Sequence, residues 1–366
     1  MDRSAPTHHV TPEIASSPTL PGQVYGDAEL FEHWKRAIFA RSWQWIGTRA
    51  EAPKPGHARP FLLLPGLLDE PLVLSRDDSG ELWVFSNVCT HRAKLVLEEE
   101  GPTRTLVCRY HGRSFEADGR CRAAPGFEKV SDVPGPDDNL PRVALGELFG
   151  HLFVSLDPEV PFEVWAQPLR ERFAFLDIDT YRREAARDRE YTLPAHWALY
   201  VDNYLEGFHI PTVHPELARS VESESYRNEL FPHGTLQTGF ATADETLAFE
   251  HPEASADPSL RVAGFYAWLF PNTMFNVYPW GLSLNVVQPI DLRRTRIVYR
   301  GYVGRPELTE GGAGGALDLV EAQDQAVVAS VQQGVGASLY RSGRFAPGPE
   351  VGVHHFHRRL ASYTKR

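Results

Sequence analysis

Two short pairs of metal-binding residues constrain this chain of 366 residues more than any other feature. Cys89 and His91 are separated by one residue, and Cys108 and His111 are separated by two. Thiolate sulfur and imidazole nitrogen are the donors that zinc, copper and iron–sulfur centres take from proteins. A chain with this pattern is therefore expected to bring two loops together around a metal group.

The mixed order of the ligands indicates which metal group that is. A Rieske [2Fe-2S] cluster takes two cysteines on one iron and two histidines on the other, and the histidines raise its reduction potential. A tetrahedral zinc site also accepts two cysteines and two histidines, but zinc fingers usually pair cysteine with cysteine and histidine with histidine. The sequence therefore favours a Rieske cluster over zinc.

The residues around the two pairs predict loops at the ends of strands. Residues 81–88 are expected to form a strand that leads into Cys89, and residues 105–107 a shorter one that leads into Cys108. This part of the chain resembles the Rieske domain of ring-hydroxylating oxygenases, with two departures. Such domains usually carry Gly at the position of Ala93 and Trp at the position of Arg113. Neither residue is a ligand, but both bear on the shielding and potential of the cluster.

Composition limits the remaining possibilities. The chain has 42% hydrophobic and 23% charged residues, as in ordinary globular proteins, and is long enough for two domains. Its net charge of −11 argues against nucleic acid and anionic membranes as partners. No signal peptide or membrane-spanning run is expected. Two of the three cysteines are assigned to the cluster, so Cys121 has no partner for a disulfide and is expected to be a small, partly buried residue. A chain without disulfides suits a reducing compartment, and a cytoplasmic location is expected.

A second group of ligands is predicted about a hundred residues later. Apolar residues recur at helical spacing over 197–208 and predict a buried stripe, while Asp202, Glu206 and His209 share another face of the same expected helix. Pro211 is expected to end this helix. The break lets His209 and His214 converge on one point, and two imidazoles with one carboxylate form the facial triad of non-haem Fe(II) oxygenases.

The segment 202–215 closely resembles the mononuclear-iron motif of Rieske non-haem iron oxygenase large (α) subunits. Glu206, in place of Asp, makes it most similar to the choline and carnitine monooxygenase branch. The resemblance extends from about Tyr25 to Arg359. It implies a third ligand on a late helix shortly before Gln-x-Gly, and the acid at that position is Asp324, with Glu321 and Asp318 as the alternatives.

The resemblance also implies a role for Glu206 between subunits. In this family the acid bridges to a Rieske histidine of a neighbouring subunit, here His111, within a head-to-tail homotrimer. From the residues alone, Glu206 could equally orient His209 within its own chain. Asn203, on the same segment, is counted with Glu206 among the candidate catalytic residues.

Between the two iron-binding helices the chain predicts a sheet. Residues 262–270, 282–288 and 295–303 are rich in β-branched and aromatic residues, with turns between them. Such a sheet, wrapped around helices, would enclose an apolar pocket beside the iron. Aromatic residues that could hold a quaternary ammonium group or an aromatic ring there, although such residues are more often core, are Trp268, Phe270, Phe275, Tyr278 and Trp280.

These features together predict an α+β protein. A Rieske all-β domain, 45–155, is expected within a helix-grip catalytic domain formed by 1–44 and 156–366. The expected function is a terminal oxygenase that passes electrons from the cluster to Fe(II), activates O₂ and hydroxylates or oxidatively demethylates a small substrate, with quaternary ammonium compounds as candidates.

No dinucleotide-binding fingerprint is present, so electrons from NAD(P)H are expected to arrive through a separate reductase or ferredoxin. Two alternatives remain open. One is the α subunit of an aromatic-ring cis-dihydroxylating dioxygenase, and the other is an electron-transfer Rieske protein that is not an enzyme.

Overall fold

The chain forms two compact units, one inserted in the sequence of the other. The computed structural model describes residues 10–249, 261–315 and 317–364. Residues Phe39–Ala166 form the inserted unit, and the larger unit combines Met1–Ile38 with Gln167–Arg366. The segment expected to be the Rieske domain, 45–155, lies within the inserted unit.

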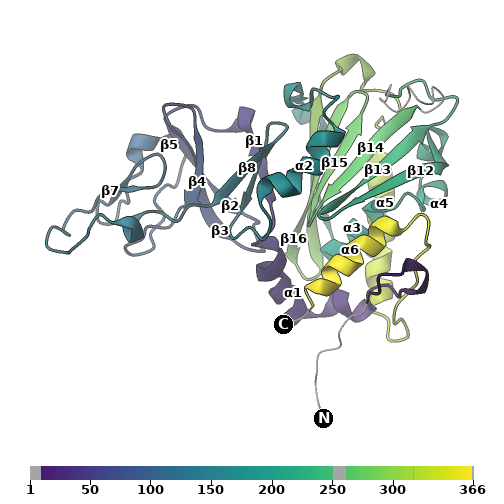
Figure 1. The fold of residues 1–366 in the computed structure, drawn as a ribbon, viewed down its shortest axis with the longest axis horizontal. Coiled ribbons are helices and arrows are strands. Elements are labelled where there is room, and N and C mark those ends of the chain that lie inside the picture. The colour runs from purple at the N-terminus through teal and green to yellow at the C-terminus, as the bar shows by residue number, and fades with distance from the viewer. Residues whose placement is uncertain (1–9, 250–260, 316, 365–366) are drawn as a thin grey trace, which may run out of the picture. The chain divides into compact units, whose positions relative to one another are not determined.

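The inserted unit consists of three small antiparallel sheets (Figure 1). They surround a core that includes Phe85, Leu106 and Phe115 together with both cluster cysteines. In sheet order the strands are β1 (Gln44–Thr48), β9 (His151–Ser155) and β8 (Ala144–Leu148); β4 (Leu82–Ser86), β3 (Glu70–Arg76), β2 (His57–Leu63) and β5 (Gly101–Pro102); and β6 (Ser114–Phe115) with β7 (Cys121–Ala123).

One of the two expected ligand-bearing strands is present and the other is not. Strand β4 leads into the first loop as predicted. Before Cys108, however, residues Thr103–Thr105 form a 3-10 turn, and Val107 makes only an isolated bridge to Ser114. The prediction of a strand over 105–107 was wrong, because so short an apolar run does not distinguish a strand from a turn that buries one leucine.

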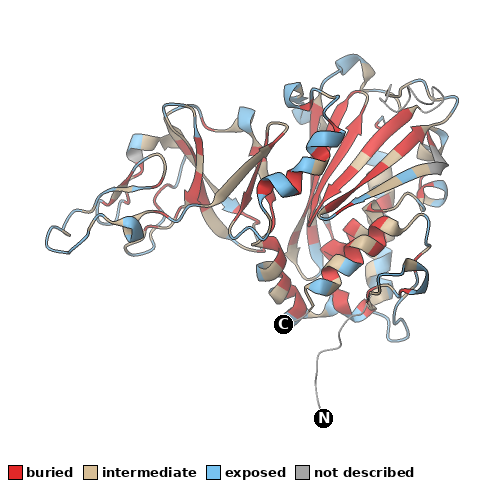
Figure 2. Cartoon of the chain, viewed as in Figure 1, coloured by how far each residue is buried: buried red, intermediate tan, exposed pale blue. Residues whose placement is uncertain are grey.

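The larger unit is built on one antiparallel sheet of eight strands. The expected segments 262–270, 282–288 and 295–303 correspond to three of its strands. Figure 2 shows that the strands β13 to β17 of this sheet are largely buried, as expected for a sheet covered by helices. In sheet order the strands are β10 (Arg182–Arg183), β17 (Arg294–Val303), β16 (Gly281–Asp291), β15 (Thr273–Tyr278), β14 (Val262–Leu269), β13 (Gly234–Ala241) and β12 (Val221–Phe231), with β11 (Arg189–Leu193) also paired to β17.

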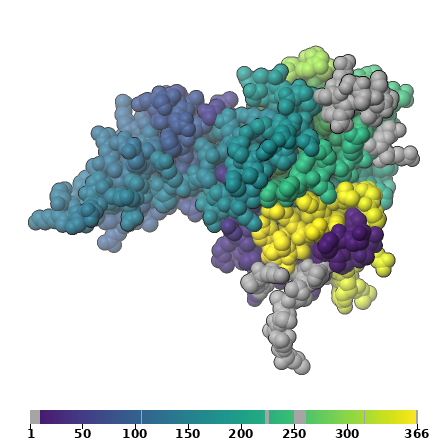
Figure 3. Space-filling model, in the orientation of Figure 1, coloured from purple at the N-terminus to yellow at the C-terminus, as the bar shows by residue number. Residues whose placement is uncertain are grey.

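The helices of this unit bring distant parts of the sequence together. Helix α3 (Trp197–Tyr204) packs against α5 (Leu317–Val335) and β16, and α6 (Val351–Ser362) packs against β12. Residues 11–20 lie against α6 (Figure 3): the carbonyl of Thr11 lies 2.8 Å from Nε2 of His354, and the N–H of Leu20 donates to Nδ1 of His357 over 2.9 Å. No described helix is long and apolar enough to span a membrane. The α-helices of the chain are α1 (Ala28–Trp34), α2 (Phe162–Arg172), α3 (Trp197–Tyr204), α4 (Ile210–Val213), α5 (Leu317–Val335) and α6 (Val351–Ser362).

Helix α3 ends five residues earlier than the sequence predicts. The carboxylate of Glu206 accepts the backbone N–H groups of Phe208 and, over 3.0 Å, of His209, and these bonds replace the helical ones. Pro211 does not end the helix. It lies in the first turn of α4, where a missing N–H is tolerated.

Because α3 ends early, the residues that were predicted to share one face of this helix do not do so. Asp202 does not share a face with Glu206 and His209, and its carboxylate instead accepts a hydrogen bond from Nε2 of His357 over 2.9 Å. The predicted apolar stripe also stops short, because Phe208 is 61% exposed.

Candidate metal centres

The two predicted cluster loops have the same backbone hydrogen bonds. In each loop the N–H of the cysteine donates to the carbonyl five residues later, and the carbonyl of the cysteine accepts the N–H four residues later, over 2.8–3.0 Å. These bonds close the segments 89–94 and 108–113. Two loops of one shape therefore carry the two ligand pairs.

The cysteines and histidines of these loops separate into a buried pair and a surface pair. Cys89 and Cys108 are 3% and 2% exposed and lie in the core of the unit. His91 is partly exposed and His111 is exposed, and their ring centroids are 4.6 Å apart. This arrangement suits a two-iron cluster with its cysteine-bound iron inside and its histidine-bound iron at the surface.

The shared loop shape explains one departure from the family pattern. The residue four positions after each cysteine has a positive φ, +79° at Gly112 and +56° at Ala93. The left-handed region costs an L-residue about 1–2 kcal/mol, whereas glycine adopts it freely. The family's glycine at the position of Ala93 therefore relieves a strain that this chain retains.

Replacing Ala93 with Gly should raise the free energy of unfolding of the inserted unit by about 1 kcal/mol. Gly112→Ala, at the equivalent position, should lower it by a similar amount. Thermal unfolding of the loaded protein, followed by loss of the visible absorbance of the cluster, measures both changes. An unchanged or lower midpoint in Ala93→Gly would contradict the assignment of strain to Ala93.

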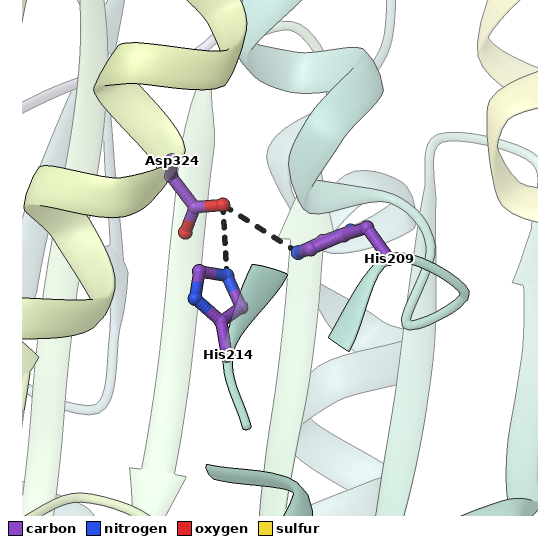
Figure 4. A group of neighbouring side chains, drawn as sticks. All are labelled: His209, His214 and Asp324. Atoms are coloured by element: carbon purple, nitrogen blue, oxygen red, sulfur yellow. Dashed lines mark hydrogen bonds and ion pairs between the residues drawn. The ribbon is translucent and has the colours of Figure 1, made fainter. Parts of the chain in front are cut away.

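A second group of ligands lies in the larger unit. Oδ1 of Asp324, on α5, is 3.0 Å from Nε2 of His214 and 3.5 Å from Nε2 of His209 (Figure 4). Among the described residues, no other three His, Cys, Asp or Glu side chains place ligand atoms within 4.8 Å of one another. Cys89, His91, Cys108 and His111 do not form such a set. This is expected if two irons lie between their sulfur and nitrogen atoms, whereas a single zinc ion would hold all four ligand atoms close together.

The outer nitrogens of both histidines have acceptors that fix the tautomer. Nδ1 of His209 is 2.6 Å from Oε1 of Glu206, and Nδ1 of His214 is 2.7 Å from Oε1 of Gln323. A carboxylate and an amide oxygen accept hydrogen bonds, so Nδ1 carries the proton in each ring. Each neutral imidazole therefore presents the lone pair of Nε2 to the common point. The role of Gln323 was not foreseen from the sequence.

This donor set fits a divalent iron. Two Nε2 lone pairs and a carboxylate oxygen are all acceptors, and they repel one another unless a cation lies between them. Burial by itself lowers the pKa of His214, but the hydrogen bond and the negative charge of Asp324 outweigh burial and raise it. The site therefore favours positive charge at this point. Asn203 supports the carboxylate by donating from Nδ2 to Oδ1 of Asp324 over 3.1 Å. Two histidines and one carboxylate leave positions open for O₂ and substrate on non-haem Fe(II).

The two alternative acids have other partners. Oε2 of Glu321 accepts hydrogen bonds from the hydroxyls of Tyr200, over 2.8 Å, and Tyr299. Burial and the nearby charge of Asp324 raise the pKa of Glu321 to about 7. Asp318 forms an ion pair with Arg189 over 3.0 Å. Neither acid joins the two histidines, whereas Asp324 does.

A cavity of about 80 Å³ adjoins the triad, which contributes to its wall. Five tyrosines line the cavity. Burial holds the pKa of each of their hydroxyls above the usual value, so the phenols are neutral. Glu206 and Glu321 also line the cavity. The tyrosines are Tyr200, Tyr204, Tyr226, Tyr266 and Tyr278, and the neutral polar residues are Asn203, Asn276, Ser283 and Asn285.

Of the five aromatic residues proposed for this pocket, only Tyr278 lines it. Phe275 points to the other side of the sheet, since it precedes the cavity residue Asn276 on β15. Trp268 lies farther along β14, where its ring contacts Phe356 of α6 at 5.3 Å between centroids. The others belong to the core, and the tyrosine-rich wall was missed because its members come from separate elements.

Comparison with protein families identifies both units. The sequence matches the Rieske [2Fe-2S] domain over residues 42–134 and the catalytic domain of the ring hydroxylating alpha subunit over residues 178–366. The chain belongs to this family. Its Rieske cluster, non-haem iron and α+β fold follow, and so does its class, an O₂-using oxidoreductase with the role of a terminal oxygenase. The alternative of an electron-transfer Rieske protein is excluded.

Individual relatives agree in length and fold. The carnitine monooxygenase oxygenase subunit of Escherichia coli (strain K12) is 30% identical over 362 residues, covering 95% of this chain and 94% of that protein. The chloroplastic choline monooxygenase of Beta vulgaris is 26% identical, covering 96% and 78%. A solved structure of a quaternary ammonium Rieske monooxygenase is 26% identical, with a TM-score of 0.74 over 96% of this chain and 97% of that one. This branch agrees with the resemblance found around Glu206.

Proposed function

We propose that this oxygenase hydroxylates or oxidatively demethylates a small quaternary ammonium compound, bound in the tyrosine-lined cavity beside iron held by His209, His214 and Asp324. The observation that carries the proposal is the wall of that cavity, which combines five tyrosines with the carboxylates of Glu206 and Glu321. Relatives named for carnitine and choline support the same substrate class.

The composition of the wall favours a cation over an aromatic hydrocarbon. The faces of tyrosine rings attract a quaternary ammonium group, by about 0.5–2 kcal/mol for each well-placed ring. Buried carboxylates add an attraction that a neutral aromatic substrate would not use, and they would lose hydration without compensation beside it. The cavity therefore supports monooxygenation of a cation better than cis-dihydroxylation of an aromatic ring.

The bound iron supplies activation of O₂, and the protein supplies position and protons. The net reaction places one oxygen atom in a C–H bond of the substrate and releases the other as water, with two electrons and two protons consumed. Since the chain has no dinucleotide fingerprint, a separate reductase or ferredoxin delivers the electrons from NAD(P)H. None of the three cysteines forms a disulfide, which suits a reducing compartment such as the cytoplasm.

The cation-binding role of Glu321 can be tested with choline and its neutral tert-butyl isostere, 3,3-dimethylbutanol. At about pH 8.5, where a carboxyl group with a pKa of about 7 is ionised, Glu321→Gln removes the negative charge and should weaken binding of the cation by about tenfold, equivalent to ~1.4 kcal/mol. Binding of the neutral isostere should change little. Calorimetry or spectral titration of the iron-loaded protein measures both, and carnitine and glycine betaine extend the series if choline binds poorly.

Glu310→Gln is a matched control, because it removes the same charge from a side chain that is 95% exposed. It should leave both affinities unchanged. Equal weakening of the cation and its isostere by Glu321→Gln would show that the residue shapes the cavity rather than attracting charge. Turnover of benzoate or naphthalene with a surrogate reductase, without turnover of any quaternary ammonium compound, would overturn the proposed substrate class.

We also propose that Glu206 joins the two iron centres of neighbouring subunits in a head-to-tail homotrimer. An ionised carboxylate offers about four acceptor positions. Within its own chain Glu206 accepts three bonds, from the N–H groups of Phe208 and His209 and from Nδ1 of His209. One position stays open for the exposed His111 of a neighbouring copy, and a closed ring of such contacts is a heterologous assembly.

Glu206→Gln tests this bridge. The variant should keep both iron centres and a reducible cluster, but oxidation of the reduced cluster in a single turnover should slow by at least about tenfold, since the charged hydrogen bond to the neighbouring histidine is lost. Rapid-mixing spectroscopy of the cluster measures the rate.

Two results would contradict the bridge. The first is a near-normal rate of cluster oxidation in Glu206→Gln, and the second is an active monomer in sizing experiments. Loss of mononuclear iron from the variant would instead show that Glu206 only orients His209 within its own chain.

A further inference from the structure

Arg113 is a buried cation at the end of the second cluster loop. Its side chain is 4% exposed, whereas the neighbouring His111 is exposed. Its carbonyl accepts the N–H of Cys108 over 2.8 Å and so closes the loop 108–113. Burial of a charge is costly unless it is paired and hydrogen-bonded, so the partners of this guanidinium reveal what holds it there.

The guanidinium connects the two ligand loops. Nη1 of Arg113 donates to Oγ1 of Thr90 over 3.0 Å and to Oδ1 of Asp138 over 2.8 Å. Thr90 lies between the two ligands of the first loop, and its own hydroxyl donates to the carbonyl of Asp138 over 2.7 Å. The charge is therefore fixed in position relative to both ligand pairs.

The positive charge also lies close to the histidine end of the site. The guanidinium carbon of Arg113 is 5.0 Å from the centroid of the Phe127 ring, and that ring is 5.1 Å from the ring of His91 in an edge-to-face contact. A single aromatic ring therefore separates the guanidinium of Arg113 from the predicted ligand His91.

One hydrogen-bond donor of Arg113, its Nε–H, suits an acceptor of the kind that a [2Fe-2S] cluster offers. Nε is buried and has no hydrogen-bond partner among the described residues. An unsatisfied buried donor costs about 1–3 kcal/mol. The sulfur atoms of a [2Fe-2S] cluster are acceptors, and hydrogen bonds to them and nearby charge both set its reduction potential.

We propose that Arg113 raises the reduction potential of the Rieske cluster, with Asp138 partly offsetting its charge. Reduction adds one electron to the cluster, and a fixed positive charge in a medium of low dielectric constant stabilises that electron. The tryptophan usual at this position in the family carries no such charge. The proposal concerns the cluster alone and is independent of the substrate.

Two substitutions with opposite expected effects test the proposal. Arg113→Gln removes the positive charge and should shift the potential downward. Asp138→Asn removes the offsetting negative charge and should shift it upward. Arg113→Lys keeps the charge but loses the planar fork, and its potential should stay nearer to that of the parent than to that of Arg113→Gln. Potentiometric titration followed by the electron paramagnetic resonance signal of the reduced cluster measures all three.

The matched control is Arg120→Gln in the same unit, because Arg120 is 67% exposed and pairs with Asp118 over 2.6 Å. Its potential should equal that of the parent, and iron and sulfide analysis confirms that each variant is loaded. Shifts in the same direction for Arg113→Gln and Asp138→Asn, or no shift in loaded protein, would overturn the proposal. A potential in Arg113→Lys as low as in Arg113→Gln would also overturn it. If Arg113→Gln does not fold, Arg113→Lys and Asp138→Asn decide the question.

Discussion

The catalytic unit depends on one electrostatic constraint, the convergence of three acceptor atoms on one point. Two imidazole lone pairs and a carboxylate oxygen of Asp324 repel one another at this distance unless positive charge, a proton or a metal ion, lies between them. The geometry therefore suits a bound cation such as iron, and it requires elements that hold the acceptors in place. Helix α5 supplies the carboxylate from one side, while the chain after α3 supplies His209 and His214 from the other.

The early end of α3 makes this convergence possible. A continuous helix would direct His209 and His214 to different sides. Glu206 prevents it by accepting two backbone N–H groups, and the same carboxylate fixes the tautomer of His209. The single side chain of Glu206 thus both ends the helix and orients the imidazole of His209. At the cluster, Arg113 has a comparable double role, since it closes a ligand loop and places charge beside it.

The sequence predicted which side chains lie together better than it predicted helix boundaries. Spacing and residue type were sufficient to predict that His91 lies beside His111 and His209 beside His214, because metal chemistry restricts which side chains can serve. Their roles as ligands stay predictions. The helix boundary was not predictable from periodicity, since it is decided by a hydrogen bond from a carboxylate to backbone N–H groups. Pro211 was read as a helix stop although proline also suits the first turn of a helix.

The wall of the cavity and the outer partners of the ligands were also beyond the sequence. Tyr226 and Tyr266 meet at the cavity from strands β12 and β14, which are not neighbours in the sheet, so no local pattern connects them. Gln323 is recognisable as a partner of His214 only once α5 is placed. By contrast, the family's preference for Gly at Ala93 was noted from the sequence, and the positive φ there supplies its physical reason.

Metal analysis of three proteins tests the central claim, that this chain holds a cluster and a separate iron through two independent sets of ligands. The parent should contain about three irons and two sulfides per chain, of which the cluster accounts for two of each. Asp324→Ala should contain about two irons, with the resonance signal of the reduced cluster unchanged, while Glu321→Ala should keep all three. Retention of the third iron by Asp324→Ala, or its loss from Glu321→Ala alone, would contradict the assignment of the triad.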